Sequence, residues 1–109
     1  MKLQIAFNYG ARAELVQATQ KIAQMVKMGF VKVDDIDEKM ISDNLYTCNI
    51  PDPDILIRTG SEKRISNYLL WQIAYSEVIV TDEFWPDFGE ISLCNAIEEF
   101  SSRSRRFGK

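Results

Sequence analysis

The order of apolar and polar positions along the chain predicts alternating strands and helices. Residues 3–9 (LQIAFNY) are mostly apolar with little alternation, which is typical of a strand buried on both faces. Residues 12–28 carry apolar side chains at helical spacing, chiefly Leu15, Ile22 and Val26. Gly29 follows directly, and we expect it to end this helix at the C′ position.

A short second helix and a loop are expected next. The stretch VDDIDEKM predicts a helix that begins near Asp37, with Asp34, Asp35 or Asp37 as its N-cap. Residues 51–54 (PDPD) then form a loop, because proline restricts the residue before it and has no N–H to donate to a ladder.

The second half of the chain continues the alternation. Residues 55–59 (ILIRT) and 78–80 (VIV) predict two further strands. Residues 65–75 (ISNYLLWQIAY) predict a helix that is apolar on nearly all sides and therefore enclosed. Residues 91–103 predict a final amphipathic helix. Its expected apolar face consists of Leu93, Cys94, Ile97 and Phe100.

This order predicts an α/β fold, a parallel sheet with flanking helices. Ligands of such sheets bind beyond the carboxyl ends of the strands, where Gly10 and residues 58–66 are expected. Three strands make a thin sheet, so we expect part of it to be supplied from elsewhere.

The composition of the chain disfavours or excludes several classes of function. The 109 residues have a formal net charge of −3, which disfavours a general nucleic-acid binder. The chain has no histidine, which excludes a Ser/His or Cys/His pair within it. Cys48 and Cys94 are far apart and favour a reduced, cytoplasmic protein. No apolar run approaches the roughly 20 residues of a membrane span.

The stretch IRTGSEKRISN concentrates candidate chemistry. Arg58 is expected at a strand end, and Arg64 and Ser66 flank the expected start of a helix, where free N–H groups favour anions. Guanidinium groups bind phosphate oxygens in pairs, and Glu62 is placed to orient one of these cations. A surface loop held by local ion pairs is the alternative.

Two further features have a functional and a plain interpretation. Glu77 precedes a strand and is a candidate oxygen ligand for Mg²⁺, or else an exposed acid at a turn. The last seven residues, RSRRFGK, hold four cations and no acid. They form either a solvated helix end or a tail that meets an anion.

Three stretches together resemble a known family. FNYGARAEL, DILIRTGSEKRISNYLLWQIAYSE and FWPDF are similar to consecutive signature blocks of the cis-prenyltransferases, the bacterial undecaprenyl diphosphate synthases (isoprenyl transferases) in particular. The resemblance extends from Leu3 to Gly108. It implies an α/β enzyme, usually a homodimer, that condenses isopentenyl diphosphate onto an allylic diphosphate to make a polyprenyl lipid carrier with Mg²⁺.

The resemblance also implies residue roles. Arg58, Arg64 and Ser66 match positions that grip the diphosphate of isopentenyl diphosphate, and Glu62 belongs to the same block. Glu77 matches an acid linked to magnesium. Arg106 and Gly108 match an R-x-G tail that reaches the isopentenyl diphosphate site of the partner subunit.

Departures from the family pattern set further expectations. Relatives are about twice as long, and nothing here matches the H-x-D-G-N-x-R-type loop that carries their catalytic aspartate. We therefore expect residues 1–109 to be a single partial domain, the C-terminal half, without condensing activity of its own and prone to self-association. Ser61 also stands where a glycine is common. A non-catalytic partner subunit and a generic phosphate-binding module are the alternatives, and contact with a membrane is expected only through the lipid product.

Overall fold

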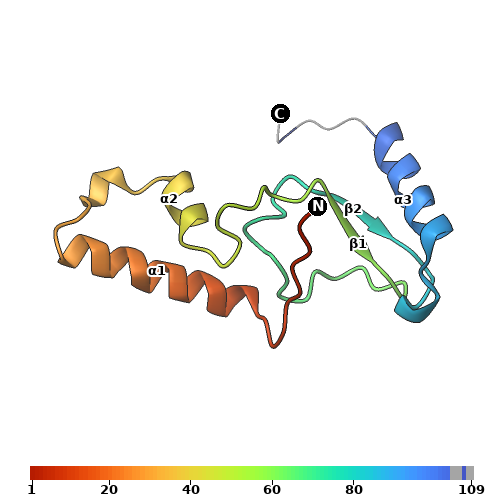
Figure 1. Cartoon of the computed structure of the whole chain (residues 1–109), viewed down its shortest axis with the longest axis horizontal. Coiled ribbons are helices and arrows are strands. Elements are labelled where there is room, and N and C mark those ends of the chain that lie inside the picture. Colours follow the sequence, from red (N-terminus) through yellow and green to blue (C-terminus); the bar gives the residue numbers. More distant parts are fainter. Residues whose placement is uncertain (104–106, 108–109) are drawn as a thin grey trace. The chain divides into compact units, whose positions relative to one another are not determined.

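The structure is a computed structural model, and it describes residues 1–103 and 107. Its elements, shown in Figure 1, are α1 (Ala11–Lys27), a 3₁₀ turn (Val33–Asp35), α2 (Glu38–Asp43), β1 (Ile55–Arg58), β2 (Glu77–Val80), a second 3₁₀ turn (Trp85–Asp87) and α3 (Glu90–Ser102). They belong to two compact units. The first contains Met1–Pro51 and Asn67–Trp71, and the second contains Asp52–Ser66 and the chain from Gln72 onward.

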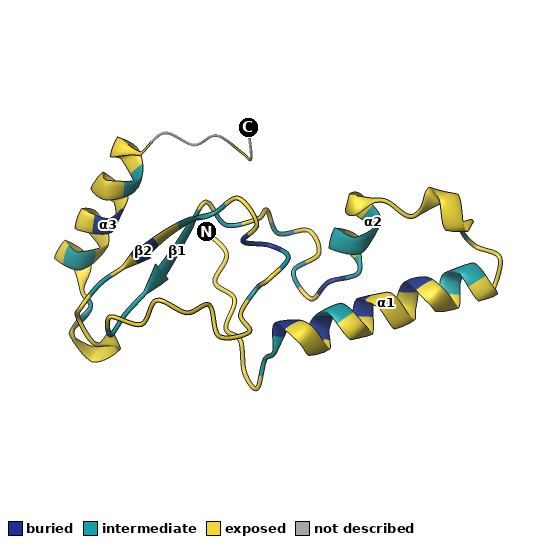
Figure 2. Ribbon diagram, turned by 180° about the vertical axis from the view of Figure 1, so that it is seen from behind, coloured by how far each residue is buried: buried dark blue, intermediate teal, exposed yellow. Residues whose placement is uncertain are grey.

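Helix α1 buries a narrow stripe in the first unit. The buried positions are Ala11, Glu14, Ala18 and Ile22, which recur every three or four residues and appear as dark bands along α1 in Figure 2. The helix ends as predicted, because Gly29 takes a φ of +79°. Its N–H donates to Val26 O and the Phe30 N–H donates to Met25 O, both at 3.0 Å, which is the Schellman arrangement.

Helix α2 packs against α1 and begins where the sequence predicted. Asp37 is the N-cap, and its carboxylate accepts a hydrogen bond from the Met40 N–H at 2.8 Å. From the carboxyl-terminal part of the first unit, Trp71 Nε1 donates to Ser42 Oγ at 2.9 Å. This bond fastens α2 to a segment that is distant in the sequence.

The second unit is a parallel pair of strands covered by a helix. The register pairs Ile55 with Glu77 and Arg58 with Val80. Helix α3 packs on β2 through Ala96, which is 5% exposed. This corrects the expected face of the last helix: Leu93 and Ile97 are 44% and 47% exposed, and Cys94 is exposed too, because the small Ala96 makes the close approach instead.

The expected first strand is absent from the described residues. Residues 3–9 form no ladder, and Leu3 and Phe7 are 82% and 86% exposed. A strand that is apolar on both faces is stable only between neighbours that pair with its backbone and cover its side chains. No described segment supplies that pairing.

The expected enclosed helix over residues 65–75 is also wrong, since this segment consists of turns. Ser66, Asn67 and Leu69 have φ angles of 55°, 61° and 46°, which a right-handed helix does not contain. A helix apolar on nearly all sides needs cover on each of them, and local turns with a few buried side chains replace it here.

The α/β class with a parallel sheet is nevertheless confirmed by β1, β2 and the helix that covers them. No helix within the described part of the chain is long and apolar enough to cross a membrane.

Candidate functional site

The candidate site is a loop that leaves the carboxyl end of β1, called here the basic loop (Arg58–Ser66). Its first half continues the pairing of the two strands. Thr81 N–H donates to Arg58 O and Ser61 N–H donates to Thr81 O, both at 2.9 Å, and Gly60 N–H donates to Glu83 O at 2.7 Å. The loop therefore starts from a backbone that is fixed by three hydrogen bonds.

A tight turn follows at Gly60 and Ser61, with φ angles of +75° and +59°. Glycine adopts this conformation freely, whereas serine does so at some cost. The Ser61 hydroxyl donates to Asp82 Oδ1 at 2.6 Å, which offsets part of that cost. The Ser61 side chain thus links the loop to Asp82, just after β2.

The three cations of the basic loop are available to an anion. Arg58 is half-buried, and Lys63 and Arg64 are exposed. Within the described residues none of the three forms an ion pair. The alternative interpretation, a surface loop held by local ion pairs, is therefore not supported by the described residues. Glu62 and Ser66 are exposed as well, and no hydrogen bond in the described part links Glu62 to the cations it was expected to orient.

The helix N-terminus expected beside Arg64 and Ser66 does not form, because turns follow the loop. The helix dipole and the free N–H groups that were expected to favour an anion are therefore absent beside Arg64 and Ser66. Any anion at the loop is held by side chains and by the amides of the loop itself.

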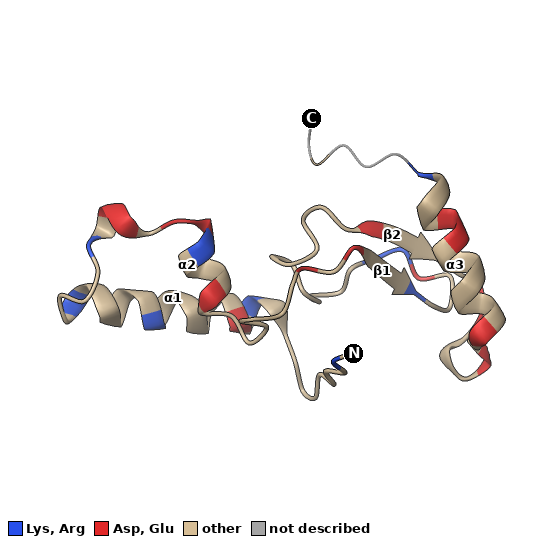
Figure 3. Cartoon of the chain, turned by 45° about the horizontal axis from the view of Figure 1, so that its top comes forward, with Lys and Arg blue, Asp and Glu red and all other residues tan. Residues whose placement is uncertain are grey.

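Glu77 lies at the other end of the sheet from Arg58. It begins β2, whereas Arg58 ends β1, and Figure 3 shows the acidic start of β2 opposite the basic end of β1. Glu77 Oε2 accepts from Arg103 Nη1 at 3.2 Å, and Arg103 also pairs with Glu99. These two carboxylates, Glu99 first, raise the pKa of the Arg103 guanidinium. No group of three or more His, Cys, Asp or Glu residues suited to a metal occurs among the described residues.

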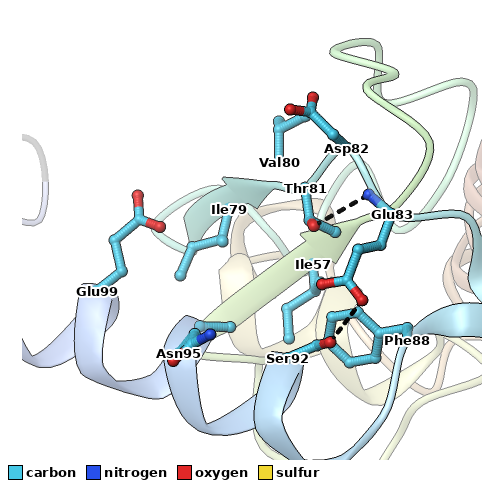
Figure 4. A pocket seen from close by; sticks show the side chains of 11 residues that line it. Ile57, Ile79, Val80, Thr81, Asp82, Glu83, Phe88, Ser92, Asn95 and Glu99 are labelled. Carbon is cyan, nitrogen blue, oxygen red and sulfur yellow. Dashed lines mark hydrogen bonds between the residues drawn. The ribbon is translucent and has the colours of Figure 1, made fainter.

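A cleft of about 270 Å³ lies between the sheet and α3 (Figure 4). Ile57, Ile79 and Phe88 supply its apolar wall. Its polar rim is acidic: Asp82, Glu83 and Glu99 line it, and Glu83 Oε2 accepts from Ser92 Oγ at 2.7 Å. Three carboxylates repel a diphosphate, so the lining of this cleft does not suit such an anion.

Sequence reasoning missed two residues that support the basic loop: the Asp82 carboxylate accepts from Ser61 Oγ, and the Glu83 backbone carbonyl accepts from the Gly60 N–H. Asp82 and Glu83 follow the last strand directly, so the rule that ligands gather at carboxyl strand ends pointed to them as well. It also missed Glu14 in the first unit, which is 2% exposed and accepts from the Tyr9 hydroxyl and, at 2.8 Å, from the Tyr46 N–H. Its signal is a glutamate in the stripe of α1 that is otherwise apolar. Arg106 and Gly108 lie outside the described residues.

The chain matches the protein-family model described as putative undecaprenyl diphosphate synthase over residues 1–108. It belongs to the undecaprenyl diphosphate synthase family. The resemblance stated from the three sequence blocks is thereby confirmed.

Relatives within the undecaprenyl diphosphate synthase family are close in sequence. An isoprenyl transferase of Lactobacillus johnsonii is 49% identical over 100% of this chain and 47% of its own length. The ditrans,polycis-undecaprenyl-diphosphate synthase of Micrococcus luteus, specific for (2E,6E)-farnesyl diphosphate, is 48% identical over 99% of this chain and 43% of its own length.

Solved structures agree with the fold. Lavandulyl diphosphate synthase from Lavandula x intermedia, solved in complex with dimethylallyl diphosphate, matches with a TM-score of 0.88 and 42% identity over 93% of this chain and 44% of its own. A probable undecaprenyl diphosphate synthase from Campylobacter jejuni matches with a TM-score of 0.77 and 33% identity over 95% and 46%. The chain thus spans less than half the length of each of these four proteins.

Proposed function

We propose that this chain is the part of a cis-prenyltransferase that binds the diphosphate of isopentenyl diphosphate. The observation that carries the proposal is the basic loop, in which three cations without an ion pair among the described residues gather at the carboxyl end of β1. Arg58, Arg64 and Ser66 are the proposed diphosphate ligands. Arg106 and Gly108 are proposed to act at the corresponding site of a partner chain.

The chemistry of the loop supports an anion with several oxygens. Guanidinium groups donate paired hydrogen bonds to phosphate, and a hydroxyl at Ser66 supplies another donor. The second substrate is proposed to be an allylic diphosphate, in line with the dimethylallyl diphosphate bound to the lavender enzyme. The proposed reaction is a repeated condensation. In each round a carbon–carbon bond forms between isopentenyl diphosphate and the allylic carbon, the allylic diphosphate leaves, a proton is lost, and the chain grows toward a polyprenyl diphosphate.

Magnesium is not accommodated by the described residues alone. Glu77 offers a single carboxylate, and Arg103 already pairs with it. Mg²⁺ prefers several oxygen ligands, so a site at Glu77 requires further oxygens, such as those of a bound diphosphate. The assignment of Glu77 to magnesium therefore stays a prediction, and no step of the proposed binding depends on it.

The test is a calorimetric titration of isopentenyl diphosphate into the folded chain, with and without Mg²⁺. We expect saturable binding that Arg64→Ala weakens about 10- to 150-fold, because a hydrogen bond to a charged group is worth about 1.5–3 kcal/mol. Lys39→Ala is the matched control. It removes one exposed cation from α2, far from the basic loop in sequence, where the Lys39 ammonium pairs with Asp43 at 2.6 Å.

Three results bear on the proposal. Absence of binding by the folded chain contradicts it, as does an equal loss of affinity in Arg64→Ala and Lys39→Ala. Equal affinity for inorganic diphosphate and isopentenyl diphosphate favours the generic phosphate-binding module instead. In a cis-prenyltransferase the hydrocarbon end adds affinity through apolar burial.

We expect these 109 residues to lack condensing activity on their own, because no stretch of the sequence is similar to the H-x-D-G-N-x-R-type loop expected to carry the catalytic aspartate. Polyprenyl product formed by the purified chain from both diphosphates contradicts this part. Association into a homodimer, a cytoplasmic location and peripheral membrane contact through the product stay predictions.

A further inference from the structure

The three residues after β2, called here the brace (Thr81–Glu83), hold the turn of the basic loop. The Thr81 and Glu83 carbonyls accept from the N–H groups of Ser61 and Gly60, at 2.9 and 2.7 Å. The brace is itself compact, because Thr81 Oγ1 accepts from the Glu83 N–H at 3.3 Å (Figure 4). Loop and brace both belong to the second unit, so these contacts lie within one compact part of the protein.

The two acids of the brace have different partners. The Glu83 carboxylate accepts from Ser92 Oγ of α3 at 2.7 Å, whereas the Asp82 side chain points away from Ser92 in Figure 4. Asp82 Oδ1 accepts from the Ser61 hydroxyl at 2.6 Å. Glu83 therefore fastens the brace to α3, and Asp82 fastens the basic loop to the brace.

The backbone of Ser61 depends on this support. Its φ of +59° lies in the left-handed region, which serine enters at a cost and keeps only where its surroundings hold it. The described bonds that hold Ser61 are its N–H to Thr81 O and its hydroxyl to Asp82 Oδ1. The first would form with any residue except proline at this position, so the bond to Asp82 is the one that depends on the serine side chain.

We infer that Asp82 is a positioning residue for the proposed diphosphate site: by holding the turn at Ser61, it fixes the direction in which the loop carries Arg64. The inference rests on the proposed function for its ligand and assigns Asp82 no contact with the diphosphate. Its prediction is opposite in sign to that of charge alone. An exposed carboxylate beside an anion site repels the anion weakly, so charge alone predicts tighter binding once Asp82 is removed.

The decisive variants are Asp82→Ala, which removes the acceptor and the charge, and Asp82→Asn, which removes only the charge. In calorimetry with isopentenyl diphosphate, we expect Asp82→Ala to weaken binding about three- to tenfold, the range for one lost hydrogen bond. Asp82→Asn is expected to stay within about twofold of the wild type, because its amide oxygen still accepts from Ser61. Glu98→Ala is the matched control: it removes an exposed acid from α3 in the same unit and should leave affinity unchanged.

Ser61→Gly provides a second test, since glycine adopts the left-handed conformation without a supporting bond. We expect Ser61→Gly to bind about as well as the wild type, and Asp82→Ala to cost no further affinity in that background. A loss of the same size in both backgrounds would overturn the inference. Tighter or unchanged binding by Asp82→Ala, or an equal loss in Asp82→Asn, would do so too.

Amide hydrogen exchange of the ligand-free chain separates this inference from the proposed function. Asp82→Ala is expected to speed exchange at Gly60 and Ser61, whose N–H groups bond to the brace, and Asp82→Asn to leave it unchanged. If the wild-type chain binds no isopentenyl diphosphate, the proposed function fails, and the exchange experiment still decides whether Asp82 holds the turn. Unchanged exchange at both amides in Asp82→Ala contradicts the inference, and circular dichroism checks that each variant is folded.

Discussion

At the scale of single residues, the most unusual group is the carboxylate of Glu14, which is buried in the first unit. Burial of a carboxylate is costly unless hydrogen bonds compensate for the water it loses. The Tyr9 hydroxyl and the Tyr46 N–H provide two such bonds. Burial, followed by the bond to Glu14, raises the pKa of the Tyr9 hydroxyl.

This pKa shift predicts a pH dependence of stability. The folded-state pKa of Tyr9 lies above the unfolded value of 10.0, so folding favours the neutral hydroxyl. The resulting stabilisation is complete below pH 10 and is lost as the pH rises from there through the folded-state pKa. We expect urea unfolding between pH 8 and about 11 to show a steeper decline in the wild type than in Tyr9→Phe.

Tyr9→Phe is also expected to lower the free energy of unfolding at pH 8 by about 1 kcal/mol, because Glu14 loses one donor. Tyr46→Phe is the control, since the backbone N–H of Tyr46, and not its hydroxyl, binds Glu14. Identical slopes above pH 10 in the wild type and Tyr9→Phe would contradict the assignment to Tyr9.

Predictions for single residues were confirmed where the residue acts on the backbone of its own segment. The cap at Asp37 and the left-handed Gly29 follow from short-range geometry that the sequence displays. Tyr46 is 32 residues from Glu14, and Asn67, which accepts from the Arg12 N–H at the start of α1, is 55 residues from Arg12, so no local pattern reveals these partners. The roles of Arg58, Glu62, Arg64, Ser66 and Glu77 in binding stay predictions, although the loop that holds the first four is placed where the strand rule put it.

At the scale of elements, the end of α1 shows what a single backbone angle contributes. A Cβ added at Gly29 meets no atom within 4 Å, so crowding is not an issue there. Its φ of +79° is the remaining constraint. Gly29→Ala is therefore expected to lower the free energy of unfolding by about 1–2 kcal/mol, measured by urea titration followed by circular dichroism.

Gly29→Asn is the matched comparison, because asparagine enters the left-handed region at lower cost than alanine while adding a larger side chain. We expect it to retain more stability than Gly29→Ala. The reverse order would mean that the side chain at this position, and not its backbone angle, sets the cost.

Element predictions were right for the three helices and for the two paired strands, and wrong for two segments whose patterns require cover on several sides. Helices α1, α2 and α3 appear because each needs only one packed face. A strand over residues 3–9 or a helix over residues 65–75 needs packing partners on several sides. The described part of the structure does not supply those partners, and neither element forms. An apolar pattern thus indicates that the side chains of a segment must be buried. The predicted helix or strand forms only where neighbouring segments bury them.

At the scale of the whole molecule, each of the two units exposes large apolar side chains. Phe7, Trp85 and Ile91 are 86%, 72% and 79% exposed, and the sheet has only two strands within the described residues. Parallel sheets are normally larger and covered on both faces. Surface of this kind drives association.

We therefore expect the purified chain to self-associate at tens of micromolar in multi-angle light scattering. Ile91→Glu is expected to shift the distribution toward smaller species without unfolding the protein, because an acid in the first turn of α3 suits the helix dipole. A monomer at these concentrations contradicts the prediction. Circular dichroism of Ile91→Glu checks that any shift does not arise from loss of structure.

The close fit of Gly10 against Asn67 limits which substitutions the sequences of this family accept at these two positions. A Cβ placed on Gly10, at the start of α1, would lie 3.0 Å from Asn67 Nδ2. A side chain larger than hydrogen at position 10 presses on the amide at position 67, so neither position is independent of the other. Sequences that replace the glycine are expected to have replaced the asparagine too, and the two changes should be tolerated together better than either alone. An alignment of many relatives, read for covariation of this one pair across 57 positions of sequence, would reveal the contact without any structure.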